Sequence, residues 1–512
     1  MNDLGKTIIK GKMRIVTPVH IGGAQEKHLL KGLDFVNEGP TIYFLDEKKI
    51  IAKTGINQYS NALATNKLIE LIKIQKINLG DISGRQTTIT GEVGNEIKTN
   101  IKNTISGKPI IPGSSLKGSI RSIIYNYANN GTVTPTIGRN GKPDNMEVPV
   151  LGRIDEDPFR YFIVNDIEFN RSGYINTKTY NLLSADTGGW KHARNTSVRF
   201  NEIGFTFPHE VIPIKEICDF EIVLNHNSIV QAGLKKKILL NNRTKEIFES
   251  KEQSILFDTI KNYSNNYLQK EINFFTKYKG EFSNTILDEL NRLKELNSQS
   301  PLLRLGLGSG FHAMTGDTLH SSHLIDFIAV SGNRTRGKLN RSDSAKSRKL
   351  AFEIIDNEYK FYPMGFVQLM TDEYYENNFK QQHEERLKLT KEIEKLELEN
   401  RIKAAERLEA ERKENDEKIR TKLEQEKLAA AEALKPKTIS ITALKKAKYI
   451  DAIVCGQEGK MLLFHPYVQG FETQICKIGY SSGMPDGTVI QVKCFSNNGK
   501  TLQFQESPIV KK

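Results

Sequence analysis

The sequence predicts an α+β protein in four parts: two α+β units in tandem, a long charged helix and a small C-terminal β-barrel. Up to about residue 375, runs rich in β-forming residues alternate with helical patterns. Residues 376–435 contain neither Gly nor Pro, and the 77 residues from Pro436 onward contain at least four β-like runs. A chain of 512 residues is also too long for one compact domain.

The first unit, residues 1–212, is predicted from β-like runs bounded by glycine and proline. A helix is expected between residues 56 and 77, where apolar residues recur at spacings of three and four. The expected strands are 12–21, 41–45, 109–111 and 161–169. Strand, helix and strand in this order fit an α+β sandwich.

The second unit, residues 213–375, repeats this cycle. A strand is expected at 219–224, followed by a polar, helix-prone stretch that ends near Leu296. A glycine-rich segment, 302–310, and a closing strand, 361–370, complete the unit.

The third part, residues 376–435, is predicted to be one helix, because Glu, Lys, Leu and Ala dominate it. At about 1.5 Å per residue such a helix would measure roughly 90 Å. Leu389, Ile393 and Leu396 keep a coiled-coil spacing, but the pattern then drifts. A solvated spacer is therefore favoured over a coiled coil.

The fourth part, residues 436–512, is predicted to be a β-barrel of the OB kind. The β-like runs are 438–442, 450–455 with 460–464, 473–480, 488–495 and 502–504. Its aromatic residues could stack on single-stranded RNA or fill the barrel core.

The charge balance favours a polyanionic partner. The helix 376–435 holds 15 basic and 16 acidic residues, so the rest of the chain, with 59 basic and 45 acidic residues, carries +14. No apolar run is long enough for a membrane span, and residues 1–12 lack the apolar core of a signal peptide, so a cytoplasmic protein with no membrane contact is expected. The four cysteines include no CxxC pair, and neither a metal nor a cofactor is expected.

The segment 108–128 is the most informative motif. A short strand is expected to end at Pro112, and Ser114 or Ser115 to cap the helix that follows. Lys117 and Arg121, four residues apart, would then share one face of the helix. Hydroxyls, free N–H groups at a helix start and two cations suit a phosphate backbone, although an ordinary capped helix with exposed cations fits the pattern equally well.

Two further glycine-rich turns are candidate RNA contacts. His20, Gly22 and Gly23 follow the first strand, where glycine lets a ligand lie against the main chain. The second turn, 304–310, has an imperfect dinucleotide-binding spacing with no acidic partner, so a Rossmann fold is not expected. Its candidate residues are Gly306, Gly308 and Gly310.

Two basic segments complete the candidate RNA-binding surface. The stretch 331–349 predicts a basic loop that orders on a phosphate backbone or stays solvated. Trp190, beside basic residues, could stack on a base or belong to the core. The candidate cations of the two segments are Arg194, Arg334, Arg336, Lys338 and Arg341.

Catalytic signals are poor. His312, His320 and His323 cluster without an HExxH or DxD pattern, so no metal site is expected. Asp34 is the one carboxylate close in sequence to the proposed binding surface. A credible general acid and base pair is missing near the glycine turns.

These motifs resemble those of the RAMP superfamily of CRISPR-associated proteins. The resemblance rests on Thr17–Gly23, Ile111–Arg121, Arg304–Gly310 and Pro363–Leu369, and covers about residues 10–370. The last segment is similar to the closing strand of the subunit that caps the type III-A (Csm) effector complex at the 3′ end of its guide RNA.

The resemblance implies tandem ferredoxin-like (RRM-like) domains and a non-catalytic subunit. Such a subunit would grip crRNA, dock on the repeated backbone subunit and support assembly and crRNA maturation in antiviral defence. Asp34 lies roughly where the backbone subunits carry a cleaving aspartate, and a structural role is favoured for it here. Two alternatives stay open: a RAMP endoribonuclease using Asp34 or a histidine such as His20, and an adaptor whose helix and barrel recruit host ribonucleases.

Overall fold

The computed structural model describes ten stretches of the chain: residues 5–23, 28–130, 147–184, 186–201, 204–314, 345–433, 436–444, 449–480, 482–497 and 501–511. It divides into two compact units, Met1–Glu394 and Lys395–Lys512. Each unit has its own hydrophobic core. No helix in the described stretches is both long and apolar enough to cross a membrane.

The first sheet of the larger unit is antiparallel and five-stranded. In spatial order its strands are β15 (Leu302–Arg304), β18 (Phe366–Met370), β1 (Thr7–Ile15), β14 (Ile217–Leu224) and β8 (Phe162–Val164). β1 ends well before the predicted Ile21, because the N–H groups of Val16 and Thr17 both donate to the carbonyl of Phe366 and the chain leaves the sheet.

The second sheet is built on a ten-residue strand, β10. Its strands are β12 (Asn195–Ser197), β11 (Gly188–His192), β10 (Gly173–Leu182), β16 (Ser347–Ile355) and β17 (Glu358–Pro363), with β13 (Phe207–Val211) also paired to β10. The predicted strand 361–370 is therefore two strands. Gly365, with φ of 94°, carries the chain from β17 in the second sheet to β18 in the first.

Both sheets combine strands from either side of residue 212. β1 pairs with β14 and β18, and β10 pairs with β16. The predicted boundary between 212 and 213 therefore does not separate the two sheets. Strand pairing over long sequence distances, which local patterns do not reveal, interleaves the two halves.

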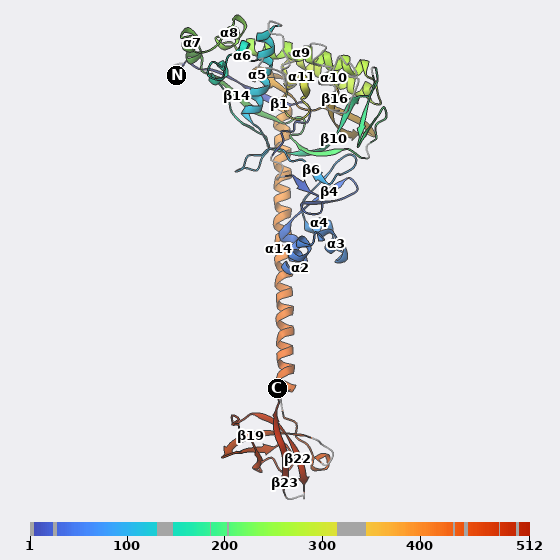
Figure 1. Cartoon of the computed structure of the whole chain (residues 1–512), viewed down its shortest axis with the longest axis vertical. Helices are drawn as coiled ribbons and strands as arrows, with labels where there is room; N and C mark the ends of the chain where they lie inside the picture. Colours follow the sequence, from blue (N-terminus) through green and yellow to red (C-terminus); the bar gives the residue numbers. More distant parts are fainter. Residues whose placement is uncertain are drawn as a thin grey trace, which may run out of the picture. The chain divides into compact units, whose positions relative to one another are not determined.

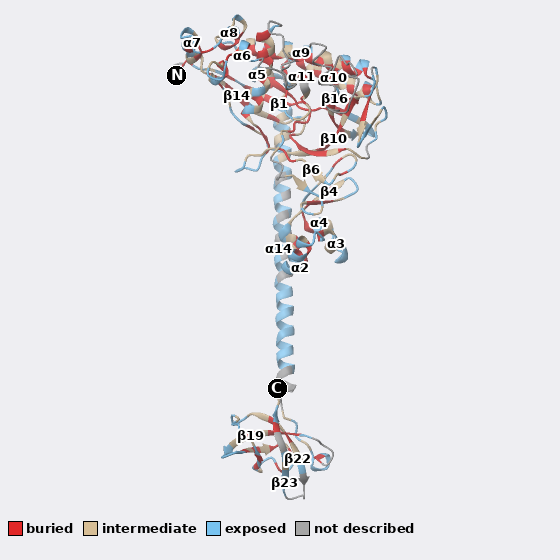
Figure 2. Cartoon of the chain, in the orientation of Figure 1, coloured by how far each residue is buried: buried red, intermediate tan, exposed pale blue. Residues whose placement is uncertain are grey.

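Three long helices cover one face of both sheets: α5 (Gly113–Asn129), α9 (Gln253–Lys277) and α10 (Ser283–Gln299). Figure 1 shows α9 and α10 on one side of β10 and β16. One core cluster packs Met13 and Phe220 of the first sheet on Ile120 of α5. A second packs Trp190 and Phe352 of the second sheet on Leu290 of α10. Figure 2 shows buried residues in red along these helices and strands.

A small insertion lies between β1 and β7. Its strands are β2 (Leu29–Leu30), β3 (Phe35–Glu38), β4 (Thr41–Leu45), β5 (Ser83–Thr88) and β6 (Glu96–Ile97), and its helices are α1 (Glu47–Thr54), α2 (Ile56–Ala64), α3 (Leu68–Ile74) and α4 (Leu79–Ile82). The single helix predicted for 56–77 is thus two helices, separated where Asn66 has φ of 54°.

The remaining elements of the larger unit are short. They are β7 (Ile110–Ile111), α6 (Val148–Leu151), η2 (Pro158–Tyr161), β9 (Ile167–Glu168), α7 (His226–Leu234), α8 (Asn242–Phe248), α11 (Gly310–Met314) and α13 (Asp372–Asn378).

The charged helix α14 (Lys380–Ala433) is continuous, close to the predicted range. Its first turns belong to the larger unit: the Arg14 guanidinium lies 4.4 Å from the Phe379 ring centroid, and Arg386 pairs with Glu216 at 3.4 Å. Most of its other described residues are exposed, pale blue in Figure 2.

The smaller unit ends in a five-stranded sheet in the order β21 (Cys476–Gly479), β20 (Met461–Pro466), β19 (Ile450–Glu458), β22 (Val489–Asn497) and β23 (Leu502–Val510). β21 also contacts β23, which closes the sheet around Phe464 and Ile490. The predicted strand 438–442 is instead a single bridge at Ile439 followed by the short helix α15 (Ile441–Leu444).

Candidate nucleic-acid interface

The two glycine turns predicted far apart in the sequence lie against each other. The Leu307 N–H donates to the His20 carbonyl at 2.8 Å. Gly306, with φ of 64°, is required there, because a Cβ atom at this position would lie 2.3 Å from the same carbonyl oxygen.

The other two motifs join them. The Gly365 N–H donates to the Pro18 carbonyl at 2.9 Å, and the Leu305 N–H donates to the Gly365 carbonyl at 2.8 Å. From α5, the Ser119 hydroxyl donates to the Arg304 carbonyl at 3.0 Å. We call the assembly of residues 18–23, 304–308 and 364–365 the glycine junction. It lies where β1 and β15 end and β18 begins.

A buried ionic network supports the junction. Arg348 of β16 donates from Nε to Glu271 of α9 at 2.7 Å, and Arg304 Nε donates to the Met364 carbonyl at 2.8 Å. The Arg304 Nη1 atom also lies 3.9 Å from the Glu271 carboxylate and donates a hydrogen bond to the Tyr267 hydroxyl. The three charged side chains of this network are at most 7% exposed. The Glu271 carboxylate therefore serves both guanidinium groups as a counter-charge inside the protein.

The opposite face of the second sheet carries cations of a different kind. Lys349 follows Arg348 on β16 and therefore points to the other face. Its ammonium lies 5.2 Å from the Phe207 ring centroid, and its backbone lies beside Gly308 of the junction. Burial lowers the pKa of Lys349, and the charges of Lys191 and Lys98 lower it further.

We call Lys98, Lys191, Lys349, His20 and His209 the basic cluster. Lys98 pairs with Glu96 at 2.7 Å, whereas no carboxylate in the described part of the chain pairs with Lys191 or Lys349. The two lysines held together without an acidic partner favour an anionic ligand, and a phosphate backbone supplies the charge spacing that such a surface needs.

The two histidines of the cluster are uncharged. Their rings meet edge to face with centroids 4.8 Å apart. Burial, the neighbouring His20 and the nearby lysines lower the pKa of His209 to about 3. Burial also lowers the pKa of His20, although the carbonyl and carboxylate of Glu210 act in the opposite direction.

Buried Glu210 holds the segment that carries Lys98. Its carboxylate accepts from the Asn100 N–H at 3.2 Å and pairs with Lys102 at 2.7 Å. Its backbone N–H donates to the Lys98 carbonyl at 2.8 Å. The position of Lys98 beside β13 is therefore defined by the fold.

The start of α5 differs from its prediction. Neither Ser114 nor Ser115 caps the helix; the N-cap is Pro112, and the Gly113 N–H donates to the Asp166 carboxylate at 2.7 Å. Gly113 is required because an added Cβ would lie 2.1 Å from the Val164 carbonyl. The Asp166 carboxylate already occupies part of the anion site expected at this helix end.

The two cations of α5 also differ from each other. Arg121 pairs with Asp157 and, at 2.7 Å, with Glu147. Burial acts to lower the pKa of Arg121, but these two carboxylates outweigh it and raise it. Lys117 forms no ion pair among the described residues. Burial lowers its pKa, the Asp157 charge acts in the opposite direction, and the Arg121 charge lowers it further. Gly118, the residue after Lys117, is exposed, and no described atom lies within 4 Å of where its side chain would begin.

Trp190 is not available for stacking, which corrects the prediction. Its side chain is fully buried between the Tyr180 and Phe361 rings, and its indole N–H donates to the Glu281 carbonyl at 3.0 Å. Arg194, in contrast, is exposed at the turn between β11 and β12.

Several candidate residues have structural roles or lie outside the description. The Asp34 carboxylate accepts from the Leu30 N–H at 2.8 Å, closing a local turn. His312 is buried, and the described residues contain no group of His, Cys, Asp and Glu arranged for a metal. Arg334, Arg336, Lys338, Arg341, His320 and His323 lie outside the described residues.

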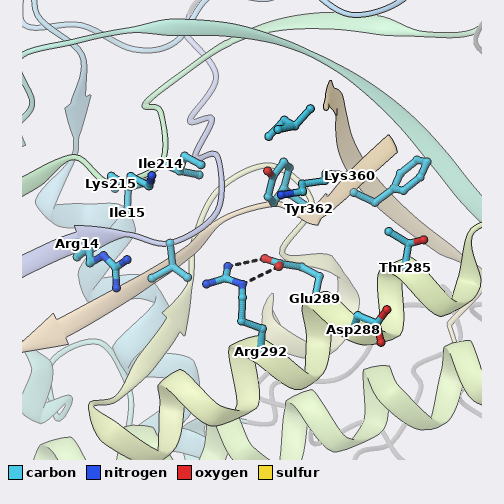
Figure 3. Close-up of a pocket in the computed structure, with 13 residues that line it drawn as sticks. Arg14, Ile15, Ile214, Lys215, Thr285, Asp288, Glu289, Arg292, Lys360 and Tyr362 are labelled. Carbon is cyan, nitrogen blue, oxygen red and sulfur yellow. Dashed lines mark hydrogen bonds and ion pairs between the residues drawn. The ribbon is translucent and has the colours of Figure 1, made fainter. Parts of the chain in front are cut away.

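A hollow of about 420 Å³ lies between the end of β1, α10 and β17. Arg14 lies on one side of it and Asp288 on the other, with Arg292 and Glu289 joined in between (Figure 3). The charged side chains around it are four basic ones and two acidic ones, Asp288 and Glu289. Because acids lie within the hollow and Glu289 pairs with Arg292, it suits a polyanion less well than the basic cluster does.

The sequence of this chain matches a known protein family. The sequence model of the RAMP superfamily matches residues 12–312. The chain belongs to the RAMP superfamily. The match includes the first three motifs and four members of the basic cluster, whereas Lys349 and the C-terminal barrel lie beyond it.

Individual RAMP relatives are more distant. The CRISPR system Cms protein Csm5 of Methanocaldococcus jannaschii is 23% identical over 329 residues, covering 59% of this chain and 71% of that protein. The Csm5 protein of Streptococcus thermophilus is 30% identical over 185 residues, 30% of this chain and 50% of that protein. A chain in the cryo-EM structure of a type III-A Csm–crRNA–target RNA ternary complex superposes with a TM-score of 0.52 at 22% identity, over 70% of this chain and all of that chain. This last similarity establishes the shared fold.

Sequence reasoning missed Lys98 and His209, and counted Lys349 only within a basic loop. No local motif marks them, because β6, β13 and β16 are brought together by tertiary structure. A usable signal was the placement of Lys349 next to Arg348 in an alternating strand, which sends one of the two cations to each face.

Proposed function

We propose that this protein is a non-catalytic crRNA-binding subunit that caps the 3′-end side of a type III-A CRISPR effector complex. The relatives named Csm5 and the shared RAMP fold support this assignment. The observation that carries the RNA-binding part is the basic cluster beside the glycine junction, where Lys191 and Lys349 have no acidic partner among the described residues.

The cluster favours contacts with the RNA backbone over base readout. The ammonium groups of Lys191 and Lys349 on one sheet face, with that of Lys98 near them, can each hold a phosphate, and phosphate contacts position a nucleic acid without reading its sequence. Gly22, Gly23 and Gly308 allow the chain of the ligand to approach closely. On α5, Ser114, Ser115 and Lys117 are proposed as further contacts, while the charge of Arg121 is largely offset.

The endoribonuclease alternative has less support. Asp34 is occupied in a local turn, and the two buried histidines of the cluster touch each other without a carboxylate partner for either ring. Among the described residues, neither arrangement supplies an acid and a base poised at one point. A subunit that grips the guide without cutting it agrees better with these residues.

Several finer assignments belong to the same proposal. The repeated backbone subunit is the expected neighbour, host ribonucleases are expected partners of the barrel, and a cytoplasmic location is expected. The two sheets are proposed to derive from RRM-like units. The barrel order β21-β20-β19-β22-β23 supports an OB-like assignment, since an OB-fold is a five-stranded barrel.

The test of RNA binding is the salt dependence of guide-RNA affinity. Replacing Lys98, Lys191 and Lys349 together by Ala should lower the slope of log affinity against log salt by about 2, because each lost single-strand phosphate contact removes about 0.7. A matched control replaces three lysines of α14, Lys403, Lys413 and Lys418, two of which pair with glutamates one turn away. Equal slopes for the cluster variant and the wild type would contradict the proposal.

The role of the barrel is tested by two truncations. A chain ending at Glu394 keeps Phe379, His383 and Arg386 and should fold and join the complex, while losing an accessory contact with the guide or a partner. A chain ending at Tyr375 lacks these contacts and should lose about 2 kcal/mol of stability. Failure of the longer chain to assemble would make the barrel a structural part of the complex.

A further inference from the structure

His20 has one ring nitrogen that is used and one that is not. Its Nδ1 lies 2.7 Å from the Glu210 carbonyl oxygen. Because a carbonyl only accepts hydrogen bonds, Nδ1 carries the proton, and in the neutral ring Nε2 carries a lone pair. Among the described residues, none hydrogen-bonds Nε2.

The free nitrogen faces an open side of the glycine junction. His20 is only 5% exposed, yet among the described residues a Cβ added at exposed Gly22 would meet just one atom within 4 Å, His20 Nε2 at 3.7 Å. A larger residue at position 22 would cover this nitrogen. Nε2 is thus an acceptor without a partner among the described residues, and it lies next to an exposed glycine, where a ligand against Gly22 could supply a donor.

The surrounding charges restrict what that donor can be. Lys349 is close enough to lower the pKa of His20, so a phosphate held by the cluster would bring its own nucleotide near the ring. Phosphate oxygens only accept hydrogen bonds and cannot pair with a lone pair. The sugar 2′-hydroxyl of RNA is a donor in this neighbourhood, and DNA lacks it.

We propose that His20 Nε2 accepts a hydrogen bond from a ribose 2′-hydroxyl, so that the glycine junction distinguishes RNA from DNA. This inference rests on the proposed RNA binding by the basic cluster and adds its specificity. The N–H groups of the bases are the other donors in a nucleotide, and the test separates the two sources.

The test compares three 20-nucleotide probes with the full-length protein: oligouridine RNA, its 2′-O-methyl form and oligodeoxyuridine. All three carry the same base, so differences report on the sugar alone, and the 2′-O-methyl probe removes the donor while it keeps the oxygen. The wild type should bind the RNA about threefold to tenfold more tightly than the other two, the range expected for one hydrogen bond.

Variants of His20 assign the effect to Nε2. His20→Asn retains a donor near Nδ1 for the Glu210 carbonyl and removes the acceptor, so its affinities for the three probes should become equal. His20→Gln places an amide near the Nε2 position and should retain part of the preference. His28→Asn, on the same segment and bonded to Thr99, is the matched control and should behave like the wild type.

The outcomes are distinct. If the RNA preference persists in folded His20→Asn, or if wild type binds the RNA and 2′-O-methyl probes equally, the 2′-hydroxyl inference is overturned while RNA binding stands. If the wild type binds all three probes equally and His20→Asn weakens binding of each of them alike, a base N–H is the donor and the inference is likewise overturned. Failure to bind any probe overturns the proposed function together with the inference.

Discussion

The two faces of strand β16 treat their cations in opposite ways. Arg348 points toward α9, where the carboxylate of Glu271 and the Phe274 ring, 3.9 Å away, enclose it. Lys349, the next residue, points to the other face, where its neighbours are Lys191, Lys98 and an aromatic ring. The first cation is compensated within the chain, and the second is not.

This difference distinguishes cations that stabilise the fold from cations that are available to bind an anionic ligand. Arg121 of α5, paired with Glu147 and Asp157, belongs with Arg348. A basic residue in a suggestive motif is thus weaker evidence for RNA binding than one that the fold leaves without an acid.

Removing the compensating acid should produce the largest effect. Glu271→Ala leaves the guanidinium groups of Arg348 and Arg304 buried without a counter-charge, and should lower the free energy of unfolding by about 3 to 5 kcal/mol. The control is Glu147→Ala, which removes a half-exposed carboxylate that pairs with Arg121, and it should cost less than about 1 kcal/mol. Chemical denaturation measures both, and equal costs would contradict the distinction.

Acidification should reveal the buried histidine of the basic cluster. The unfolded chain binds a proton at His209 near pH 6.5, whereas the folded protein binds it only at about pH 3. Stability is unaffected above pH 6.5 and falls as the pH decreases toward 3, by about 2 kcal/mol between pH 6.5 and 5. The difference between wild type and His209→Asn in denaturation at several pH values isolates this contribution; a constant difference would be the opposing result.

Removing the uncompensated charge should have the smallest effect, and of opposite sign. Lys349→Met retains the stem that packs near Phe207 and removes a charge whose pKa burial already lowers, so stability should rise by about 0.5 to 1 kcal/mol. The same variant should bind guide RNA more weakly. A loss of stability would mean that the Lys349 charge serves the fold.

The parts of the fold set by local sequence could be predicted. α14 lies within the predicted range because composition alone makes it helical. The pairing of strands across the predicted boundary at residue 212 could not be predicted, since β1 finds its partners more than 200 residues along the chain. The end of β1 also depends on a remote carbonyl, that of Phe366.

In the candidate site too, features with a local sequence signature could be predicted and features set by tertiary contacts could not. The glycines could be found because a turn that needs a positive φ leaves a local signature, as at Gly306 and Gly308. The Ser114 cap was wrong because the acceptor for Gly113 comes from Asp166, which no local pattern links to α5. Whether Trp190 stacks on a base or lies in the core could not be decided from the sequence, because its burial depends on tertiary packing.

Lysine acetylation footprinting of the full-length protein, with and without guide RNA, tests the central claim most directly. Mass spectrometry reports the modified fraction of each lysine. RNA should protect Lys98, Lys191 and Lys349, while Lys413 and Lys418 of α14 should react equally in both states. Protection confined to lysines outside the basic cluster, with these three unchanged, would contradict the account.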